Sequence, residues 1–347
     1  MSKITSFGTG RLARAALACG ALLAIAPRLS YGQDTPVPDA FAQNKVLGRG
    51  VNIIGYDPIW GDMGKARFKA EYFKALKDAG FDSVRIVLQP FKYMDEGSDK
   101  LPGSWLKVLD WAVEGSQQAG LAAILDFHEF TNMGRDPEKY HGRFLEFWRQ
   151  VAPRYRHAPS SVMFELMNEP SGKLTPEMWN RYLLEALAIV RQTNPTRTVI
   201  IGPARWNGIG ALKELELPEN DRNIIVTVHY YTPMEFTHQG AAWSPENKDR
   251  KDVQWLGTGE NAGRIAGDFA QAQAWALVHN RPIFLGEFGA YDKAPMESRV
   301  RYTAAVARAA EALGWSWAYW QFDSDFILYD VDKDEWVKPI LEALIPR

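Results

Sequence analysis

Two glutamates each stand near the end of an apolar run, where a strand that only filled a core would pass into ordinary turn residues. Residues 162–170 read VMFELMNEP and residues 283–289 read IFLGEFG, so that Glu169 and Glu287 close two strand-like segments. Two carboxyl groups held close together resist joint ionisation, so one remains an acid while the other is a carboxylate. Glycoside hydrolysis uses such a pair: the acid protonates the leaving oxygen, and the carboxylate attacks the anomeric carbon. Enzymes that retain the anomeric configuration hold the two groups about 5–5.5 Å apart.

The elements that have to bring these glutamates together are indicated by a regular alternation along the chain. Strand-like segments cover residues 46–54, 82–88, 121–127, 161–167, 197–202, 223–231, 281–288 and 315–322. Helix-like segments follow them at residues 64–80, 104–120, 142–155, 175–193, 208–215, 263–280, 296–314 and 338–344. Eight strand–helix units without a linker between them predict an α/β fold, a single (β/α)8 TIM barrel. An open, doubly wound sheet is the competing fold, but no glycine-rich phosphate loop follows any of the strand-like segments.

In such a barrel the side chains at the carboxyl ends of the strands converge on one face, and active sites are built there. Glu169 would follow the fourth strand and Glu287 the seventh. Either one alone could be an ordinary surface acid, but the pair on these two strands favours catalysis. The other polar or aromatic residues late in strand-like segments or directly after them are His128, Asn168, His229, Tyr231 and Trp320. Arg85 lies in the middle of its segment, and an arginine inside a barrel needs an anionic partner.

The first 32 residues are predicted to be a signal peptide. Lys3, Arg11 and Arg14 precede the apolar run 15–26, and small residues follow it. Residues 33–44 are predicted to be a linker and residues 45–347 the barrel. The chain is therefore expected to be exported to the periplasm or secreted, with an uncleaved anchor as the alternative. The single cysteine, Cys19, lies in the leader, so the mature chain is expected to have no disulfide.

Composition narrows the classes of partner. The chain is 46% hydrophobic and 24% charged, with a formal net charge of −2, which is typical of a globular protein with a sizeable core. Basic residues are not in excess, so we do not expect the protein to bind nucleic acid. We also expect the mature chain to be a monomer that is not stably inserted in a membrane. Aromatic residues make up 12% of the chain, and their faces can pack in a core or stack on sugar rings. Tryptophans in helix-like segments, such as Trp148, are expected in the core, whereas Trp60, Trp206, Trp243 and Trp255 lie in loops and are candidates for a substrate platform.

The motifs together resemble glycoside hydrolase family 5, and bacterial endo-β-glucanases in particular. The resemblance rests on NEP at 168–170, GEFG at 286–289 and TVHYYTPMEFTHQGAAW at 227–243, and it extends over the whole mature chain. It implies a retaining mechanism without a cofactor or metal, with Glu169 as acid/base and Glu287 as nucleophile. Asn168 would bind the 2-hydroxyl of the sugar, and Arg85 and Tyr231 would hold the nucleophile and keep it ionised. The other implied substrate-binding residues are His128, His229, Trp320, Trp206 and His238.

Three departures from the family pattern leave the substrate open. Glu129 stands where close relatives have a second histidine, the strand-eight tryptophan is followed by QFDSDF, and residues 51–60 read VNIIGYDPIW. A β-linked glucan cleaved internally is the expected substrate, with the β-1,4 linkage favoured by family analogy. The alternatives are a β-1,3- or β-1,6-glucan, a mannan, transglycosylation using the loop 243–260, and a barrel that binds carbohydrate without cleaving it. Asp330, Asp332 and Asp334 lack the glycine and glutamate spacing of a calcium loop.

Overall fold

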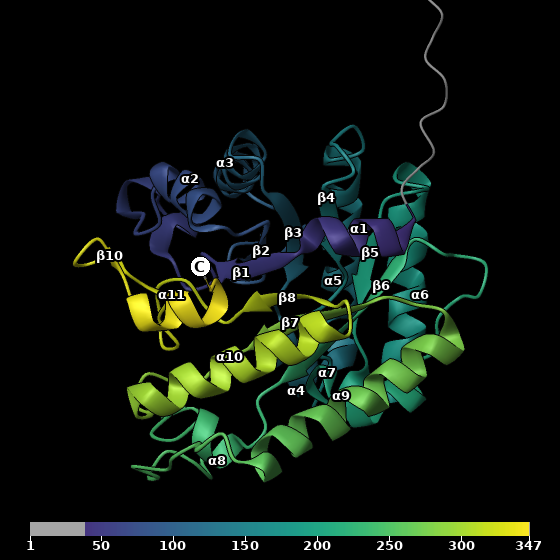
Figure 1. Cartoon of the computed structure of the whole chain (residues 1–347). Coiled ribbons are helices and arrows are strands. Elements are labelled where there is room, and N and C mark those ends of the chain that lie inside the picture. The colour runs from purple at the N-terminus through teal and green to yellow at the C-terminus, as the bar shows by residue number, and fades with distance from the viewer. Residues whose placement is uncertain (1–38, 347) are drawn as a thin grey trace, which may run out of the picture. The chain divides into compact units, whose positions relative to one another are not determined.

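Eight parallel strands close into a barrel in the computed structural model of the chain, which describes residues 39–346 (Figure 1). Each strand pairs with the next along the chain, and β8 closes the ring by pairing with β1. The strands are β1 (Arg49–Ile53), β2 (Ser83–Leu88), β3 (Ala122–Phe127), β4 (Val162–Glu165), β5 (Val199–Ile201), β6 (Ile224–Tyr230), β7 (Ile283–Phe288) and β8 (Ser316–Tyr319). The predicted single (β/α)8 barrel is confirmed.

Helices surround the barrel and return the chain from one strand to the next. They are α2 (Ala70–Ala79), α3 (Gly103–Gln118), α4 (Phe130–Arg135), α5 (Pro137–Arg154), α6 (Pro176–Thr193), α7 (Ala204–Asn207), α8 (Met234–Thr237), α9 (Gly259–His279), α10 (Met296–Ala312) and α11 (Lys338–Leu344). Short 3-10 helices occupy Pro58–Trp60, Met63–Lys65 and Ile209–Glu214, and β9 (Tyr329–Asp330) pairs with β10 (Glu335–Trp336). Local chemistry fixes several ends: the Thr175 hydroxyl accepts from the Met178 amide before Pro176 begins α6, and Gly80 ends α2 at φ 104°.

A helix covers the amino-terminal end of the barrel, where the sequence predicted part of a linker. Residues 40–47 form α1 (Ala40–Leu47), so the predicted linker 33–44 is wrong from residue 40 onward. The Asn44 amide donates to the Ile283 carbonyl at 3.1 Å and accepts from the Ser316 hydroxyl at 2.6 Å, which ties α1 to the first residues of β7 and β8. Residues 1–38, which hold the predicted signal peptide and the rest of the linker, lie outside the described residues.

The inside of the barrel is apolar near the amino-terminal ends of the strands and polar near their carboxyl ends. Ala40 and Leu47 of α1 form a buried cluster with side chains from six strands: Ala122, Ile124, Met163, Ile200, Ile225, Phe284 and Ala318. Closer to the carboxyl ends, fully buried polar side chains replace them, namely Asn52, Arg85, Asp126, Glu165 and Thr227. Strand residues that alternate with these, such as Val84 and Ile86, pack in the larger core beneath the helices. A polar layer of side chains therefore lies above the apolar cluster, on the side of the carboxyl ends of the strands.

The tryptophans divide between core and surface. Trp148 and Trp179 are fully buried in the core, as their helical positions predicted. Two of the loop tryptophans proposed as platforms are also core residues: Trp60 stacks on Trp105 with ring centroids 4.9 Å apart, and Trp255 is 3% exposed. Trp60 and Trp255 are therefore too buried to serve as the substrate platforms considered for them, because the loops that carry them pack against the helices. Trp206 and Trp243 remain 56% and 52% exposed.

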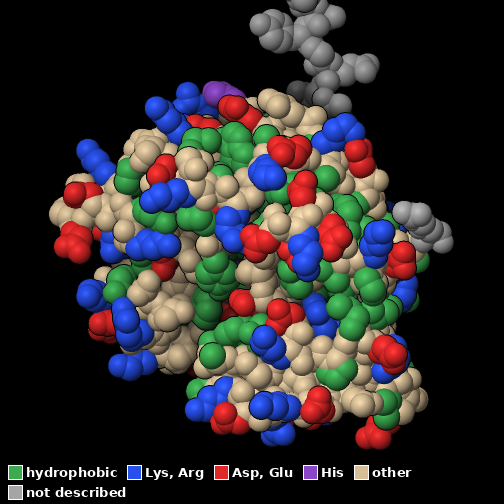
Figure 2. Space-filling model, turned by 90° about the vertical axis from the view of Figure 1, so that its left-hand side faces the viewer, with side chains coloured by type: hydrophobic (Ala, Val, Ile, Leu, Met, Phe, Trp, Pro, Cys, Tyr) green, Lys and Arg blue, Asp and Glu red, His purple; other side chains and the backbone are tan. Residues whose placement is uncertain are grey.

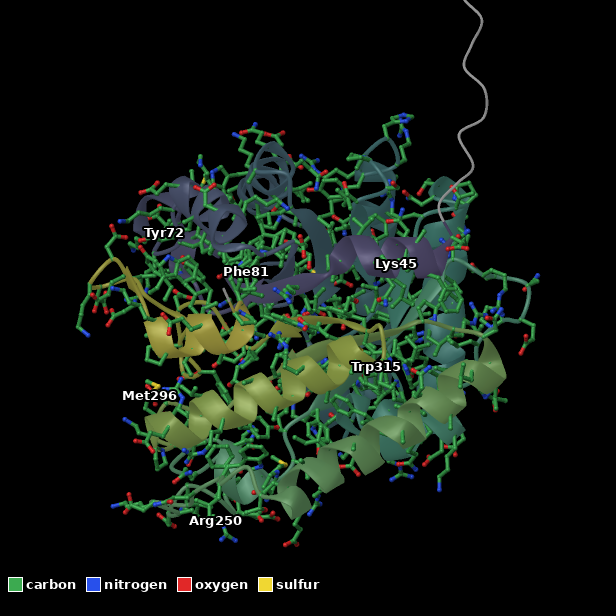
Figure 3. The ribbon with its side chains drawn as sticks, viewed as in Figure 1. Lys45, Tyr72, Phe81, Arg250, Met296 and Trp315 are labelled. Carbon is green, nitrogen blue, oxygen red and sulfur yellow. The ribbon has the colours of Figure 1, made fainter. Side chains whose placement is uncertain are left out.

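Charges of both signs are spread over the surface. On the face drawn in Figure 2, Lys and Arg side chains are interspersed with Asp and Glu around a hollow near its middle. Long polar side chains also radiate outward from the helices in Figure 3, where Lys45 marks α1 and Arg250 marks the loop before α9. Within residues 39–346, no helix combines the length and the apolar character needed to cross a membrane.

One buried arginine anchors the start of the strand that leads to Glu169. Arg197 is 8% exposed and donates to four backbone carbonyls, including that of Val162 at 2.6 Å, and to the Asn194 side chain at 2.7 Å. Replacing Arg197 with leucine leaves these acceptors buried without a donor. We expect the free energy of unfolding in chemical denaturation to fall by about 3 kcal/mol or more.

The matched control for this prediction is Arg250→Leu. Arg250 is exposed, and within residues 39–346 it makes one hydrogen bond, from its backbone amide to the Asn247 carbonyl at 3.1 Å. The control should unfold within about 0.5 kcal/mol of the wild type. Equal stability of the two variants would contradict the anchoring role of Arg197.

Candidate active site

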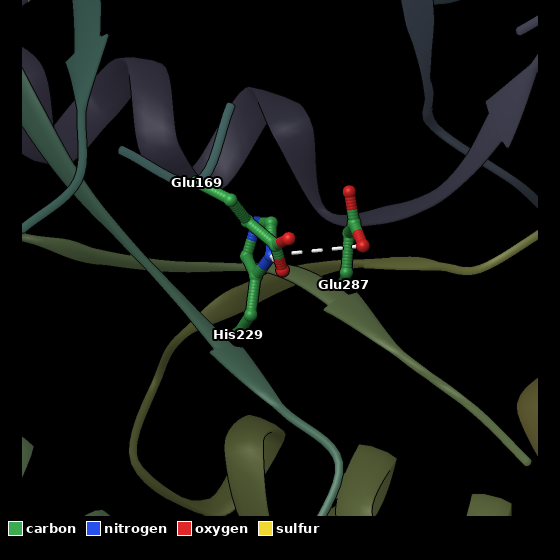
Figure 4. Close-up of side chains that lie close together, drawn as sticks. All are labelled: Glu169, His229 and Glu287. Carbon is green, nitrogen blue, oxygen red and sulfur yellow. Dashed lines mark hydrogen bonds and ion pairs between the residues drawn. The ribbon is translucent and has the colours of Figure 1, made fainter. Parts of the chain in front are cut away.

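Glu169 and Glu287 approach each other at the carboxyl ends of the strands. Glu287 lies within β7, and Glu169 lies beyond the end of β4, in a left-handed conformation with φ 43°. One oxygen of each carboxylate and one ring nitrogen of His229 all lie within 4.8 Å of one another (Figure 4). The structure thus brings together the two glutamates that the sequence singled out. This approach is much closer than the about 6.5–9.5 Å of inverting glycosidases and is compatible with the about 5–5.5 Å of retaining ones.

Arg85 lies at the centre of the polar layer and is fully buried. Its Nε and Nη2 atoms donate to the two oxygens of Glu165 at 2.7 and 2.8 Å, as a fork. Nη1 donates to Asn52 and to Glu287, and Nη2 donates to Asn168, each at 2.8 Å. The anionic partners that the sequence required for Arg85 are therefore found. A single guanidinium orients side chains from β1, β4, β7 and the loop after β4.

More carboxyl groups than cations lie in this layer. Asp126 is a further neighbour of Arg85 at 3.1 Å, and one of its oxygens is buried without a hydrogen-bond partner. Burial raises the pKa of Asp126 to about 7, against the opposing charge of Arg85. Burial likewise raises the pKa of Glu165. The site consequently holds its protons more tightly than exposed acids would.

The two opposing glutamates have different surroundings. Glu287 accepts from Arg85 and from the Tyr231 hydroxyl at 2.9 Å, whereas Glu169 has one side-chain donor among residues 39–346, His229 at 2.8 Å. Burial raises the pKa of Glu169 to about 8. Burial also raises the pKa of Glu287, although His229 and Arg85 oppose the shift. The resemblance implied that Arg85 and Tyr231 keep Glu287 ionised, but desolvation outweighs the donors, so that its pKa is raised rather than lowered. Two strong donors still favour the charged form of Glu287 over that of Glu169.

A second chain of hydrogen bonds runs from Asp126 to Asn168. Because Arg85 donates to the Asn168 oxygen, the amide nitrogen of Asn168 faces His128 Nε2, 3.3 Å away. The other ring nitrogen of His128 lies 2.6 Å from Asp126. Burial lowers the pKa of His128 to about 3, so the ring is neutral and its Nδ1 hydrogen is donated to Asp126. The His128 ring also stacks on Trp320 with centroids 5.3 Å apart and planes 9° apart. His128 therefore lies between Asn168 and Trp320, and the sugar contact predicted for His128 and Trp320 stays a prediction.

Aromatic side chains extend from this centre. Tyr56 is 55% exposed and meets the edge of Trp320 at 6.4 Å. On the other side, the Trp206 amide donates to the Pro170 carbonyl at 3.2 Å, which places this exposed indole beside the Glu169 loop. His238 meets the edge of Tyr231 at 5.0 Å, next to the nucleophile candidate. Trp206 and His238, which were predicted to bind sugar, therefore lie at the edge of the site. Neither makes a hydrogen bond to Glu169 or Glu287 within the described residues.

Several residues of the site were missed from the sequence. Asn52, Asp126 and Glu165 are buried partners of Arg85 or His128, and Asn207 contacts His229. Asp126 and Glu165 carry the signal that drew attention to Arg85, a charge inside an apolar strand. The isolated asparagines carry no such signal.

Glu129, which replaces a histidine of the family pattern, points away from the two glutamates. One oxygen accepts from the Phe91 amide at 2.6 Å, and the other accepts from the Asn132 side chain at 2.7 Å. It therefore joins the loop after β2 to the start of α4. The departure at this position concerns loop structure and leaves the two opposing glutamates intact.

The Glu169, His229 and Glu287 group also has the ligand types of a metal site. A metal would need the lone pair of His229 Nδ1. In the structure this nitrogen faces both carboxylates, at 2.8 and 3.6 Å, and is within hydrogen-bonding distance of the nearer one, Glu169. The arrangement is suited to holding protons.

Comparisons with known proteins agree with this geometry. A family model described as cellulase (glycosyl hydrolase family 5) matches residues 43–325. Endoglucanase H of Acetivibrio thermocellus is 30% identical over 318 residues, covering 88% of this chain and 33% of that protein. Endoglucanase 3 of Fibrobacter succinogenes is 26% identical over 344 residues, covering 83% of this chain and 51% of that protein. The chain thus spans about a third and about half of these relatives. The solved structure of Thermotoga maritima Cel5A with cellobiose has a TM-score of 0.84 and 41% identity, covering 88% of this chain and 100% of that one.

Proposed function

Because this chain belongs to the cellulase family, glycosyl hydrolase family 5, we propose that it is a retaining endo-β-glucanase that acts by double displacement. The observation that carries the proposal is the opposed pair of carboxylates within 4.8 Å, each with different hydrogen-bond donors. A pair so close leaves no room for a water between the second carboxylate and the anomeric carbon, which an inverting mechanism would need.

In the first step, Glu287 attacks the anomeric carbon and forms a glycosyl ester as the bond to the leaving oxygen breaks. Glu169 gives its proton to that oxygen, so the leaving sugar departs as an alcohol. In the second step, Glu169 as a carboxylate removes a proton from water, and the hydroxide attacks the anomeric carbon and releases Glu287. The β configuration is restored after two inversions, and both glutamates return to their initial protonation states.

The surrounding side chains orient the sugar and the nucleophile. Tyr231 and Arg85 hold the Glu287 carboxylate from two directions. Asn168, fixed at both ends of its amide by Arg85 and His128, presents a donor for the sugar 2-hydroxyl. Trp320, with His128 stacked on it, provides an aromatic surface for the sugar ring at the bond that is cleaved.

The substrate class rests on the relatives. The two relatives reported above are described as endoglucanases, and Cel5A has solved structures with cellobiose and with mannotriose. A β-1,4-glucan is accordingly the first candidate and a β-mannan the second. The chain is further proposed to be exported by its leader and to act as a monomer without a cofactor.

The linkage and the stereochemistry can be tested together. We expect the protein to hydrolyse cellotetraose faster than mannotetraose or the β-1,3- and β-1,6-linked glucose tetramers. Proton NMR of the first-formed product should show the β anomer before mutarotation. An α anomer would contradict the role of Glu287 as nucleophile. Binding without hydrolysis of any of the four sugars would favour a carbohydrate-binding barrel instead.

A further inference from the structure

His229 is the one side chain of the described site that contacts both opposed glutamates. Its Nδ1 lies 2.8 Å from Glu169 Oε1 and 3.6 Å from Glu287 Oε2 (Figure 4). Burial lowers the pKa of His229 to about 4, so near neutral pH the ring carries a single hydrogen. Two carboxyl oxygens on one side place that hydrogen on Nδ1. Nε2 then carries a lone pair and needs a donor.

Asn207 supplies that donor. Its amide nitrogen lies 3.2 Å from His229 Nε2, and its side chain is fully buried. It lies at the end of α7, after Arg205 and Trp206, and all three residues have positive φ angles between 52° and 59°. Three consecutive left-handed residues other than glycine are costly for the backbone. They turn the chain so that the Asn207 amide enters the barrel mouth.

Two glycines leave the space that this contact occupies. A Cβ atom at Gly202 would lie 2.2 Å from Asn207 Oδ1, and one at Gly286 would lie 2.9 Å from His229 Nε2. Any side chain at either position would displace one partner of the pair. Backbone, loop conformation and neighbouring residues therefore all favour this one contact.

The hydrogen on Nδ1 determines where the acid proton of Glu169 can be. When Nδ1 donates to Oε1, the proton of Glu169 has to lie on its other oxygen, where it is available to a leaving group. With the hydrogen on Nε2 instead, the lone pair of Nδ1 would accept the Glu169 proton, which would then be held by the histidine. The same atoms and the same net charge would give a poorer general acid.

We propose that Asn207 is a positioning residue that holds His229 in the Nδ1–H form and thereby keeps the proton of Glu169 directed at the leaving oxygen. This inference rests on the proposed function, because it assigns a role within the same reaction. Asn207 itself touches neither the substrate nor the reacting atoms. Its effect on catalysis passes entirely through His229.

The test is Asn207→Asp, which keeps the size of the side chain and tolerates the left-handed backbone but replaces the donor with an acceptor. An aspartate at this position requires a hydrogen on His229 Nε2. We expect kcat/KM for cellotetraose to fall by about 10²-fold, the usual contribution of a general acid. For dinitrophenyl cellobioside, whose leaving group needs no protonation, kcat/KM should fall by less than about fivefold.

An independent variant disturbs the same contact from the other side. Gly202→Ala should displace the Asn207 side chain and selectively reduce cellotetraose hydrolysis, whereas Gly210→Ala should leave both rates unchanged. Gly210 is the matched control because a Cβ atom there meets nothing within 4 Å. Nitrogen-15 NMR of the histidine rings gives a readout independent of activity: His229 Nε2 should be unprotonated in the wild type and protonated in Asn207→Asp.

The outcomes separate this inference from the proposed function. Equal losses on the two substrates in Asn207→Asp, or a protonated Nε2 in the wild type, would overturn the positioning role while the hydrolase assignment stands. A wild-type protein that hydrolyses neither substrate would overturn the proposed function, whatever the NMR result shows.

Discussion

Glu287→Gln is expected to lower kcat on cellotetraose by ~10⁴-fold or more, because an amide cannot form the glycosyl ester and the whole covalent route is lost. The fold should persist, since Arg85 keeps its forked contact with Glu165 and its bonds to Asn52 and Asn168. The rate is measured with the purified variant at saturating substrate. Circular dichroism and retained binding of cellotetraose serve as controls for folding.

A shorter side chain at position 287 tests whether Glu287 is the nucleophile itself. In Glu287→Ala, azide can enter the vacated space and attack dinitrophenyl cellobioside from the face that Glu287 occupied. The product should be the α-glycosyl azide. Formation of the β-glycosyl azide would show that the roles of Glu287 and Glu169 are exchanged.

Glu169→Gln is expected to have an effect that depends on the leaving group. With cellotetraose, kcat/KM should fall by about 10²–10⁴-fold, because the leaving alcohol is no longer protonated. With dinitrophenyl cellobioside, kcat/KM should change little, and added azide should accelerate turnover and yield the β-glycosyl azide. An equal loss on both substrates would contradict the acid/base role.

The pH dependence of the wild type follows from the same residue. Burial raises the pKa of Glu169 to about 8, so the protonated acid is the main form below that pH. The rate of glycosylation should therefore fall as the pH rises through about 8, and this alkaline limb should be absent in Glu169→Gln. An alkaline limb that persists unchanged in the variant would assign it to another group.

The fold could be predicted from the sequence because each strand–helix unit carries its own signals. Apolar runs mark the strands, while Thr175, Pro176 and Gly80 mark helix ends through local backbone chemistry. Strand ends in a parallel barrel converge, so the opposition of Glu169 and Glu287 followed from their places on the fourth and seventh strands. These features depend on short stretches of chain.

The remaining features depend on contacts between distant segments. The helix α1 exists because it covers the open end of the barrel, and its eight residues show little periodicity of their own. The burial of Trp60 and Trp255 and the outward turn of Glu129 depend on how loops fold over one another. The role of Asn207 depends on the contact between its amide and His229, which brings together residues far apart in the sequence. The direction in which the pKa of Glu287 shifts depends on the balance between its burial and its hydrogen-bond donors, and burial is set by the whole fold.

The shared guanidinium of Arg85 has a consequence for how the protein can change in evolution. Asn52 on β1, Glu165 on β4 and Glu287 on β7 all bind the same group, so substitutions at these positions should show strong epistasis rather than additive effects. Tyr56 and Trp206 have exposed side chains on separate loops and can vary one at a time. Lineages that acquire a new sugar preference should accordingly accumulate single changes at exposed positions such as Tyr56 and Trp206. Arg85 and its partners should persist unless several of them change together.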